Sequence, residues 1–196
     1  ICHLVFDRPG ANANLFDRDT LLELERHVTW LRVTHGLRGV ILRSAKPAIF
    51  IAGADLKTLS KASTLEIEEI LELGQRVFTD FELLPLPKVA AIHGACLGGG
   101  YELALCCDWR LSSDHPATKI GLPETQLGLL PAWGGSTRLP RLVGVQKALA
   151  HILKGPQLPA RAAKKAGLVD EVVTTACVTE RAKRLLRELD RRPFDA

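Results

Sequence analysis

Short, continuously apolar segments that alternate with amphipathic segments are the feature that most constrains the fold of this chain. "GVILRS" from Gly39, "IFIAGADLK" from Ile49 and "KVAAIHG" from Lys88 are apolar along their length rather than at every second position. Such runs are typical of strands buried on both faces of a parallel sheet. Apolar residues recur at helical spacing after Asp17 and over about 64–84. The sequence therefore predicts an α/β architecture.

The remaining segments continue the alternation. Further strands are predicted over 2–8, in "DWRLSS" from Asp108, in "KIGLPE" from Lys119 and in "LVDEVV" from Leu168. The pattern also predicts a short helix before Asp108, two or three helices over 136–166 and a last helix over 178–190. The chain has no internal repeat and no linker rich enough to divide it. We therefore expect a single domain over residues 1–196.

Composition excludes several classes of function. The net charge is +4, and the densest basic stretch, "RAKRLLRELDRR" from Arg181, contains Glu188 and Asp190, which favours a solvated helix face over a nucleic-acid surface. No apolar run approaches the roughly 18–20 residues that span a bilayer. Five cysteines without a C-x-x-C pair indicate a reducing compartment, either the cytoplasm or, in a eukaryote, the mitochondrial matrix. No cluster has metal-ligand spacing, so we expect no metal.

The glycine-rich stretch "GACLGGGYELAL", residues 94–105, is the main candidate for a functional site. It fits neither the dinucleotide fingerprint, the P-loop nor the nucleophile elbow. A strand, a glycine loop and a helix start remain, which favour backbone N–H groups that stabilise an oxyanion. "AGAD", from Ala52 to Asp55, offers a second such turn, and Glu102 and Glu124 suit paired acid–base catalysis. Close helix–strand packing and surface glutamates are the alternatives.

Four segments resemble the crotonase (enoyl-CoA hydratase/isomerase) superfamily in order and spacing. They are "FIAGADLK" (50–57), "KVAAIHGACLGGGYELALCCDWRL" (88–111), "IGLPETQLGLLPAWGGSTRLPRLVG" (120–144) and "AKKAGLVDEVV" (163–173). The third is most similar to the hydratase portion of multifunctional fatty-acid oxidation enzymes, in which a 3-hydroxyacyl-CoA dehydrogenase region follows. The resemblance implies a spiral of ββα units assembled as trimers or hexamers, or in a multifunctional complex. We expect a fragment of a longer multifunctional chain, without the family's C-terminal helices.

The resemblance also implies an activity and a site. The activity is hydration of trans-2-enoyl-CoA in fatty-acid β-oxidation, with Δ3,Δ2-enoyl-CoA isomerisation as an additional step. Glu102 matches the glutamate that activates water and Glu124 the one that protonates C2, while the N–H groups of Ala54 and Gly99 match the oxyanion hole. Contacts with the acyl-CoA substrate are expected from Ala52, Gly53, Asp55, Leu56, Lys57, Gly98, Trp133 and Gly134. Coenzyme A is part of the substrate, so no separate cofactor is required; NAD enters only if a dehydrogenase region follows.

Several alternatives stay open at this point. A pure isomerase, a thioester hydrolase or a dehalogenase would share the fold, and a non-catalytic acyl-CoA- or RNA-binding module or an assembly domain would belong to another class. Trp133 stands where small or varied residues are common in the family that the chain resembles. It is expected to narrow the acyl pocket and favour short or medium chains, unless it only packs against a neighbouring helix. His93 and the buried-type cysteines Cys96, Cys106 and Cys107 are expected to be structural.

Overall fold

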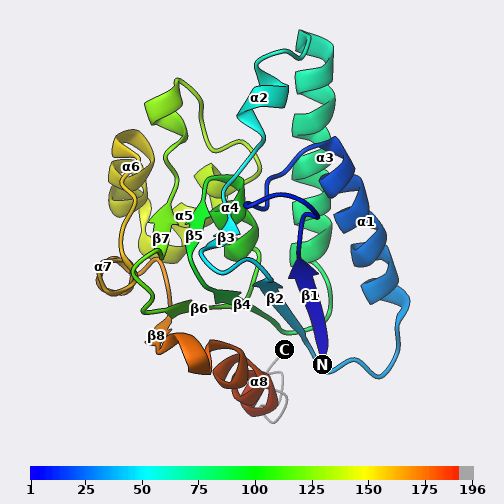
Figure 1. Cartoon of the computed structure of the whole chain (residues 1–196), viewed down its shortest axis with the longest axis vertical. Coiled ribbons are helices and arrows are strands. Elements are labelled where there is room, and N and C mark those ends of the chain that lie inside the picture. The colour runs from blue at the N-terminus through cyan, green and yellow to red at the C-terminus, as the bar shows by residue number, and fades with distance from the viewer. Residues whose placement is uncertain (190–196) are drawn as a thin grey trace.

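The structure is a computed structural model that describes residues 1–189. Its strands form two parallel sheets (Figure 1). The five-stranded sheet has the order β1 (Cys2–Phe6), β2 (Val40–Ser44), β4 (Lys88–Ile92), β6 (Trp109–Ser113), β8 (Glu171–Val173), and the three-stranded sheet has the order β3 (Ile49–Ile51), β5 (Ala95–Leu97), β7 (Lys119–Gly121). Every pair of neighbouring strands is parallel, as the apolar runs predict.

The chain repeats one motif: a strand in the larger sheet, a strand in the smaller sheet, then helices. β2 and β3 lead to α2 (Leu56–Leu59) and α3 (Thr64–Glu82), and β4 and β5 lead to α4 (Gly99–Leu105). β6 and β7 lead to the 3-10 helix η1 (Glu124–Leu127), then α5 (Gly135–Val143), α6 (Val145–Lys154) and α7 (Ala160–Ala166). This confirms the expected spiral of ββα units. The other helices are α1 (Arg18–Val33), the 3-10 helix η2 (Thr175–Cys177) and α8 (Val178–Leu189).

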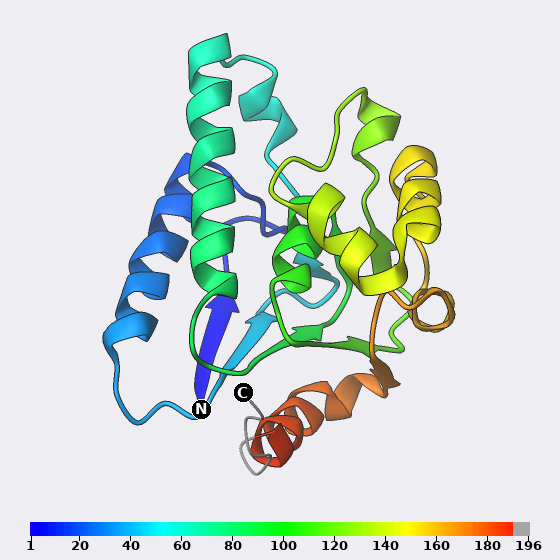
Figure 2. The ribbon, with the colours of Figure 1, turned by 180° about the vertical axis from the view of Figure 1, so that it is seen from behind.

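Alternate residues of the larger sheet enter two different apolar cores. Ile41 and Val89 pack with Ala182 of α8 in one core, whereas Val40 and Ala90 belong to the larger core shared with α1, α3 and α4. Successive strand residues point to opposite faces. Helix α8 therefore covers one face of the sheet, as Figure 1 shows, and α1, α3 and the smaller sheet lie on the other side (Figure 2).

The segment 88–97 holds two strands, β4 and β5, where the sequence predicts one strand, "KVAAIHG" from Lys88, followed directly by the glycine loop. The chain turns at Gly94, which has a φ of 79°, and then enters the other sheet as β5. A Cβ on Gly94 would lie 2.1 Å from the carbonyl carbon and oxygen of Ala48, closer than real Cβ atoms come. Glycine is therefore required where the strand passes from one sheet to the other, and this transfer brings the glycine loop to the smaller sheet.

The other local predictions agree with the structure at most positions. Asp17 caps α1 by accepting a hydrogen bond from the backbone N–H of Thr20. Helix α3 begins with a capping box in which Ser63 and Glu66 bond each other's backbone N–H groups, a signal that the sequence analysis did not identify. In α8, Arg181 pairs with Glu171 and Glu188. Arg184, Arg187 and Glu188 are exposed, as expected of a solvated helix face. Residues 190–192 of that basic stretch lie outside the described residues.

The predicted structural residues are placed as expected. His93 lies within hydrogen-bonding distance of the Ser113 hydroxyl, 3.1 Å away, and of the Pro47 carbonyl. Cys96, Cys106 and Cys107 are buried thiols that form no disulfide, and burial raises the pKa of each. None of the helices in residues 1–189 is long and apolar enough to cross a membrane.

Candidate active site

The first predicted oxyanion turn follows β3. The Phe16 N–H donates to the Gly53 carbonyl at 2.9 Å, and the Asp55 N–H donates to the Phe16 carbonyl at 2.9 Å. Gly53 itself has a φ of 96°, which favours glycine. These two bonds fix the backbone on either side of Ala54, whose own N–H donates to no other group in the described part of the chain. The Ala54 N–H is thus available to a ligand.

The second turn follows β5. Gly98 has a φ of 52° and a ψ of −129°, a conformation that only glycine adopts without strain. Its N–H donates to the Gly121 carbonyl of β7 at 3.0 Å. Gly99 is the first residue of α4, and among residues 1–189 its N–H has no protein acceptor. A Cβ on Gly53 would lie 3.7 Å from the Gly99 nitrogen, so the two predicted oxyanion donors belong to turns in contact.

Glu102 follows this turn along α4, and backbone hydrogen bonds fix its carboxyl group. It lies one turn into α4 with 2% of its surface exposed. Its Oε1 accepts the Gly135 N–H at 2.7 Å and the Trp133 N–H at 2.9 Å. Burial raises the pKa of Glu102 to about 7, assisted by the charge of Glu124 and opposed by the two N–H groups. The carboxyl group is therefore fixed in orientation and close to half-ionised at neutral pH.

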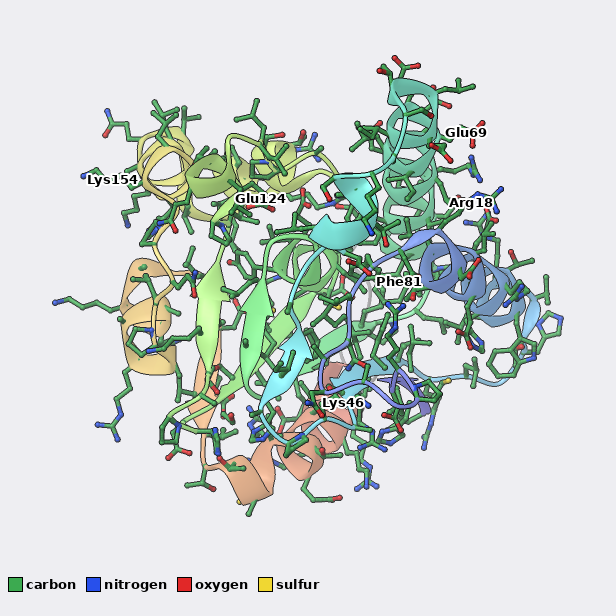
Figure 3. All side chains as sticks on the ribbon, turned by 45° about the horizontal axis from the view of Figure 1, so that its top comes forward. Arg18, Lys46, Glu69, Phe81, Glu124 and Lys154 are labelled. Carbon is green, nitrogen blue, oxygen red and sulfur yellow. The ribbon has the colours of Figure 1, made fainter. Side chains whose placement is uncertain are left out.

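Glu124 reaches the same turn from η1, beyond the end of β7 (Figure 3). A Cβ on Gly98 would lie 3.0 Å from Glu124 Oε1, so the missing side chain makes room for the carboxyl group. Both carboxyl oxygens are shielded from solvent and have no hydrogen-bond partner within residues 1–189. Burial raises the pKa of Glu124 to about 6. An enclosed, unpartnered carboxyl group is costly unless a ligand or water supplies its partner.

An ion pair between the buried Arg138 and the partly exposed Glu82 supports the loop that holds Glu102. Arg138 of α5 donates from Nη1 to the Trp133 carbonyl at 2.8 Å and from Nε to Glu82 of α3 at 2.8 Å. Gly134 allows this close approach, since a Cβ there would lie 1.8 Å from Arg138 Nη1. The charge of Arg138 lowers the pKa of Glu102. No sequence pattern marks Arg138 and Glu82 as partners, because they meet only when α5 packs on α3.

Asn14 supports the first oxyanion turn and was also missed. Its side-chain Nδ2 lies within hydrogen-bonding distance of the Phe6 and Phe50 carbonyls, at 3.0 and 3.1 Å, and of the Ser44 hydroxyl, at 2.9 Å, while its backbone carbonyl accepts the Ala52 N–H. One buried side chain therefore joins the ends of β1, β2 and β3. An asparagine in an irregular loop was the available signal, but its three partners are not visible from sequence.

The predicted acyl-CoA contacts lie around these two turns to different degrees. Ala52, Gly53 and Gly98 are in the turns themselves, and Trp133 packs on Gly99, where an added Cβ would lie 2.6 Å from the ring. Asp55 precedes α2 and Leu56, which is exposed, begins it. Gly134 precedes α5 and contacts Arg138 rather than the turns. The side chain of Lys57 lies outside the described residues. Within the described residues, no group of three or more His, Cys, Asp or Glu side chains could hold a metal ion.

Together, these groups form a site suited to a substrate carbonyl. Two N–H donors from touching turns can stabilise an oxygen that gains negative charge, and two carboxyl groups with raised pKa values lie beside them. Such a pair can exchange protons with carbon or water near neutral pH. The arrangement fits acid–base chemistry next to a polarised carbonyl.

Comparison with known proteins agrees with this geometry. The enoyl-CoA hydratase/isomerase family matches residues 1–196. An enoyl-CoA hydratase from Bacillus anthracis superposes with a TM-score of 0.89 at 35% identity, over 95% of this chain and 71% of that one. Human mitochondrial delta3-delta2-enoyl-CoA isomerase gives 0.91 at 31%, over 97% and 73%. An enoyl-CoA hydratase/isomerase from Xanthobacter autotrophicus Py2 gives 0.85 at 29%, over 97% and 70%. The chain belongs to the enoyl-CoA hydratase/isomerase (crotonase) family.

Proposed function

We propose that this chain hydrates trans-2-enoyl-CoA thioesters. The observation that carries the proposal is the carboxyl group of Glu124, which is enclosed beside Gly98 without a partner among the described residues. Glu102, in contrast, is held by two backbone N–H groups nearby. A group enclosed in this way needs a partner that arrives with the substrate. Water and the thioester supply one.

In the proposed reaction, the carbonyl oxygen of the thioester accepts hydrogen bonds from the N–H groups of Ala54 and Gly99. It gains negative charge, and C3 becomes electrophilic. Glu102, as carboxylate, takes a proton from water while the water oxygen bonds to C3. Glu124, as carboxylic acid, gives its proton to C2. One water is added in total, and the proton that Glu102 gained restores the starting state when it returns to Glu124 through solvent.

Isomerisation is the second candidate function. Two carboxyl groups near the acyl chain can move a proton from C2 to C4 without water, and one of the structural relatives is described as an isomerase. Glu102 supports hydration more strongly, because a second carboxyl group at the site gives water a base of its own. We further propose, from the resemblance of residues 120–144, that residues 1–196 are one crotonase-like region of a longer multifunctional chain.

The test is the decay of the enoyl-thioester absorbance of crotonyl-CoA, measured beside a Glu102→Ala/Glu124→Ala double variant. Decay with the parent alone supports hydration by these carboxyl groups. A parallel assay with a trans-3-enoyl-CoA detects isomerisation as the appearance of that absorbance. Isomerisation without hydration would overturn the proposal. If neither reaction occurs, the same assays with a C-terminally longer chain separate an incomplete hydratase from a binding module.

A further inference from the structure

The indole of Trp133 lies at the candidate site in a fixed position. A Cβ on Gly99 would lie 2.6 Å from Cζ3 of the indole, and a Cβ on Gly74 of α3 would lie 2.3 Å from its Nε1. The ring therefore fills the space between α3 and the start of α4, and both positions must be glycine for it to fit. Gly74 is inside a helix, where glycine costs about 1 kcal/mol relative to alanine.

Two further rings prevent the indole from moving aside. Phe16 and Phe78 each meet Trp133 edge-to-face, with ring centroids 5.5 Å apart, and Trp133 has 5% of its surface exposed. Such aromatic pairs add to the apolar burial of the side chain. The ring is thus a packed wall rather than a mobile side chain.

The backbone and side chain of Trp133 have separate tasks. The backbone N–H of Trp133 holds Glu102, while the ring borders Gly99, a predicted oxyanion donor. A thioester carbonyl bound at Gly99 would place its acyl chain close to this wall. Beyond the wall, a cavity of about 450 Å³ lies between α3 and α5, lined mainly by polar residues such as Thr79, Glu82, Ser136 and Arg138. A longer acyl chain that entered this cavity would contact charged and polar side chains, among them Glu82 and Arg138.

We propose that the Trp133 indole closes the acyl end of the site and restricts it to short acyl chains. The proposal rests on the proposed function for the position of the thioester. It predicts a preference for short over long acyl groups, because a longer chain would have to displace a packed aromatic ring.

The test compares crotonyl-CoA with trans-2-decenoyl-CoA in the parent, in Trp133→Ala and in Trp133→Leu. We expect the parent to prefer crotonyl-CoA and the smaller side chains to raise the decenoyl-to-crotonyl ratio of kcat/KM about tenfold or more. A structural role alone would lower both rates together. Trp30→Ala, at an exposed tryptophan of α1, is the matched control and should leave the ratio unchanged.

Binding of the unreactive butyryl-CoA and decanoyl-CoA, measured by calorimetry, separates this proposal from the proposed function. If the parent binds butyryl-CoA more tightly than decanoyl-CoA and Trp133→Leu loses this preference, the result supports restriction by the Trp133 ring, even if the chain hydrates neither enoyl thioester. Equal hydration of both chain lengths by the parent overturns the wall and leaves the hydratase proposal intact. Binding of neither thioester contradicts both.

Gly74→Ala gives a second test, independent of removing the indole. The added methyl group should push the ring and lower crotonyl-CoA turnover, and the loss should be relieved when Trp133→Ala is added. A Gly74→Ala variant with parental activity and parental chain-length preference would show that the ring is not held in place, and would overturn the proposal.

Discussion

Glu102 and Glu124 approach the same glycine turn but are supported in opposite ways. Glu102 is nearly inaccessible and receives two backbone N–H groups on one oxygen. Glu124, on a short 3-10 helix, has neither oxygen bonded within the described chain. One carboxyl group is oriented by the protein, while the other needs a partner from outside. The contrast indicates that the ligand completes the site at Glu124.

The pKa values sharpen the same comparison. Burial raises the pKa of Glu102 to about 7 and that of Glu124 to about 6. Between these values the pair carries about one proton, which acid–base catalysis requires. Either carboxyl group can hold this proton near neutral pH, so the pKa values do not assign the roles that the family resemblance implies. Those roles therefore stay a prediction.

Removing the proton chemistry of either carboxyl group should have the largest effect. Glu102→Gln and Glu124→Gln should each lower kcat for crotonyl-CoA by about 10²–10⁴-fold, because the amide keeps the shape and loses the transferable proton. Thioester binding, measured by calorimetry with butyryl-CoA, should change little. Glu72→Gln, at an exposed residue of α3, is the control. Parental rates in both Glu102→Gln and Glu124→Gln would contradict acid–base catalysis by these two carboxyl groups.

The pH dependence of the unfolding free energy should reveal that the Glu102 carboxyl group is buried. A folded-state pKa raised from 4.5 to about 7 means that the contribution of Glu102 to stability is full below about pH 4.5 and is lost as pH rises through about 7. Relative to the parent, Glu102→Gln should gain about 2–3 kcal/mol in unfolding free energy between pH 5 and pH 8. Urea unfolding at both pH values measures this gain. A constant difference between the two proteins would contradict the burial of an ionising group.

Arg138 should affect the held carboxyl group through its loop. Arg138→Gln removes the bonds to Glu82 and the Trp133 carbonyl, and it removes a charge that lowers the pKa of Glu102. We expect kcat to fall about 10–100-fold and the basic limb of the pH profile to move to higher pH. Arg141→Gln, at an exposed position of the same helix, should do neither. A lower rate with an unmoved limb would reduce Arg138 to a structural role.

The smallest activity effect is expected at Asn14, which supports the turn rather than either carboxyl group. Asn14→Ala leaves buried backbone groups of Phe6 and Phe50 without their partner and should cost about 1–3 kcal/mol of stability. Chemical denaturation measures the cost, with the exposed Asn12→Ala as control. Equal stability of the two variants would show that the Asn14 network is dispensable.

The sequence predicted the parallel α/β pattern because buried strands and amphipathic helices leave local periodic signals. It placed Glu102, Glu124 and the glycine turns through family resemblance, and the structure brings these predicted residues together without testing their roles. The transfer of the chain between sheets at Gly94 was missed because it depends on contact with the Ala48 carbonyl. Likewise, Arg138 and Glu82 are distant in sequence and meet only when α5 packs on α3.

The pH dependence of kcat/KM for crotonyl-CoA tests the central claim most directly, because it reports the ionisation of the free site. If Glu102 and Glu124 act as one acid–base pair, the rate should rise as pH increases through about 6 and fall as it increases through about 7. Each glutamine variant should lose one limb of this bell. A parent profile that stays flat from pH 5 to pH 8 would contradict the account.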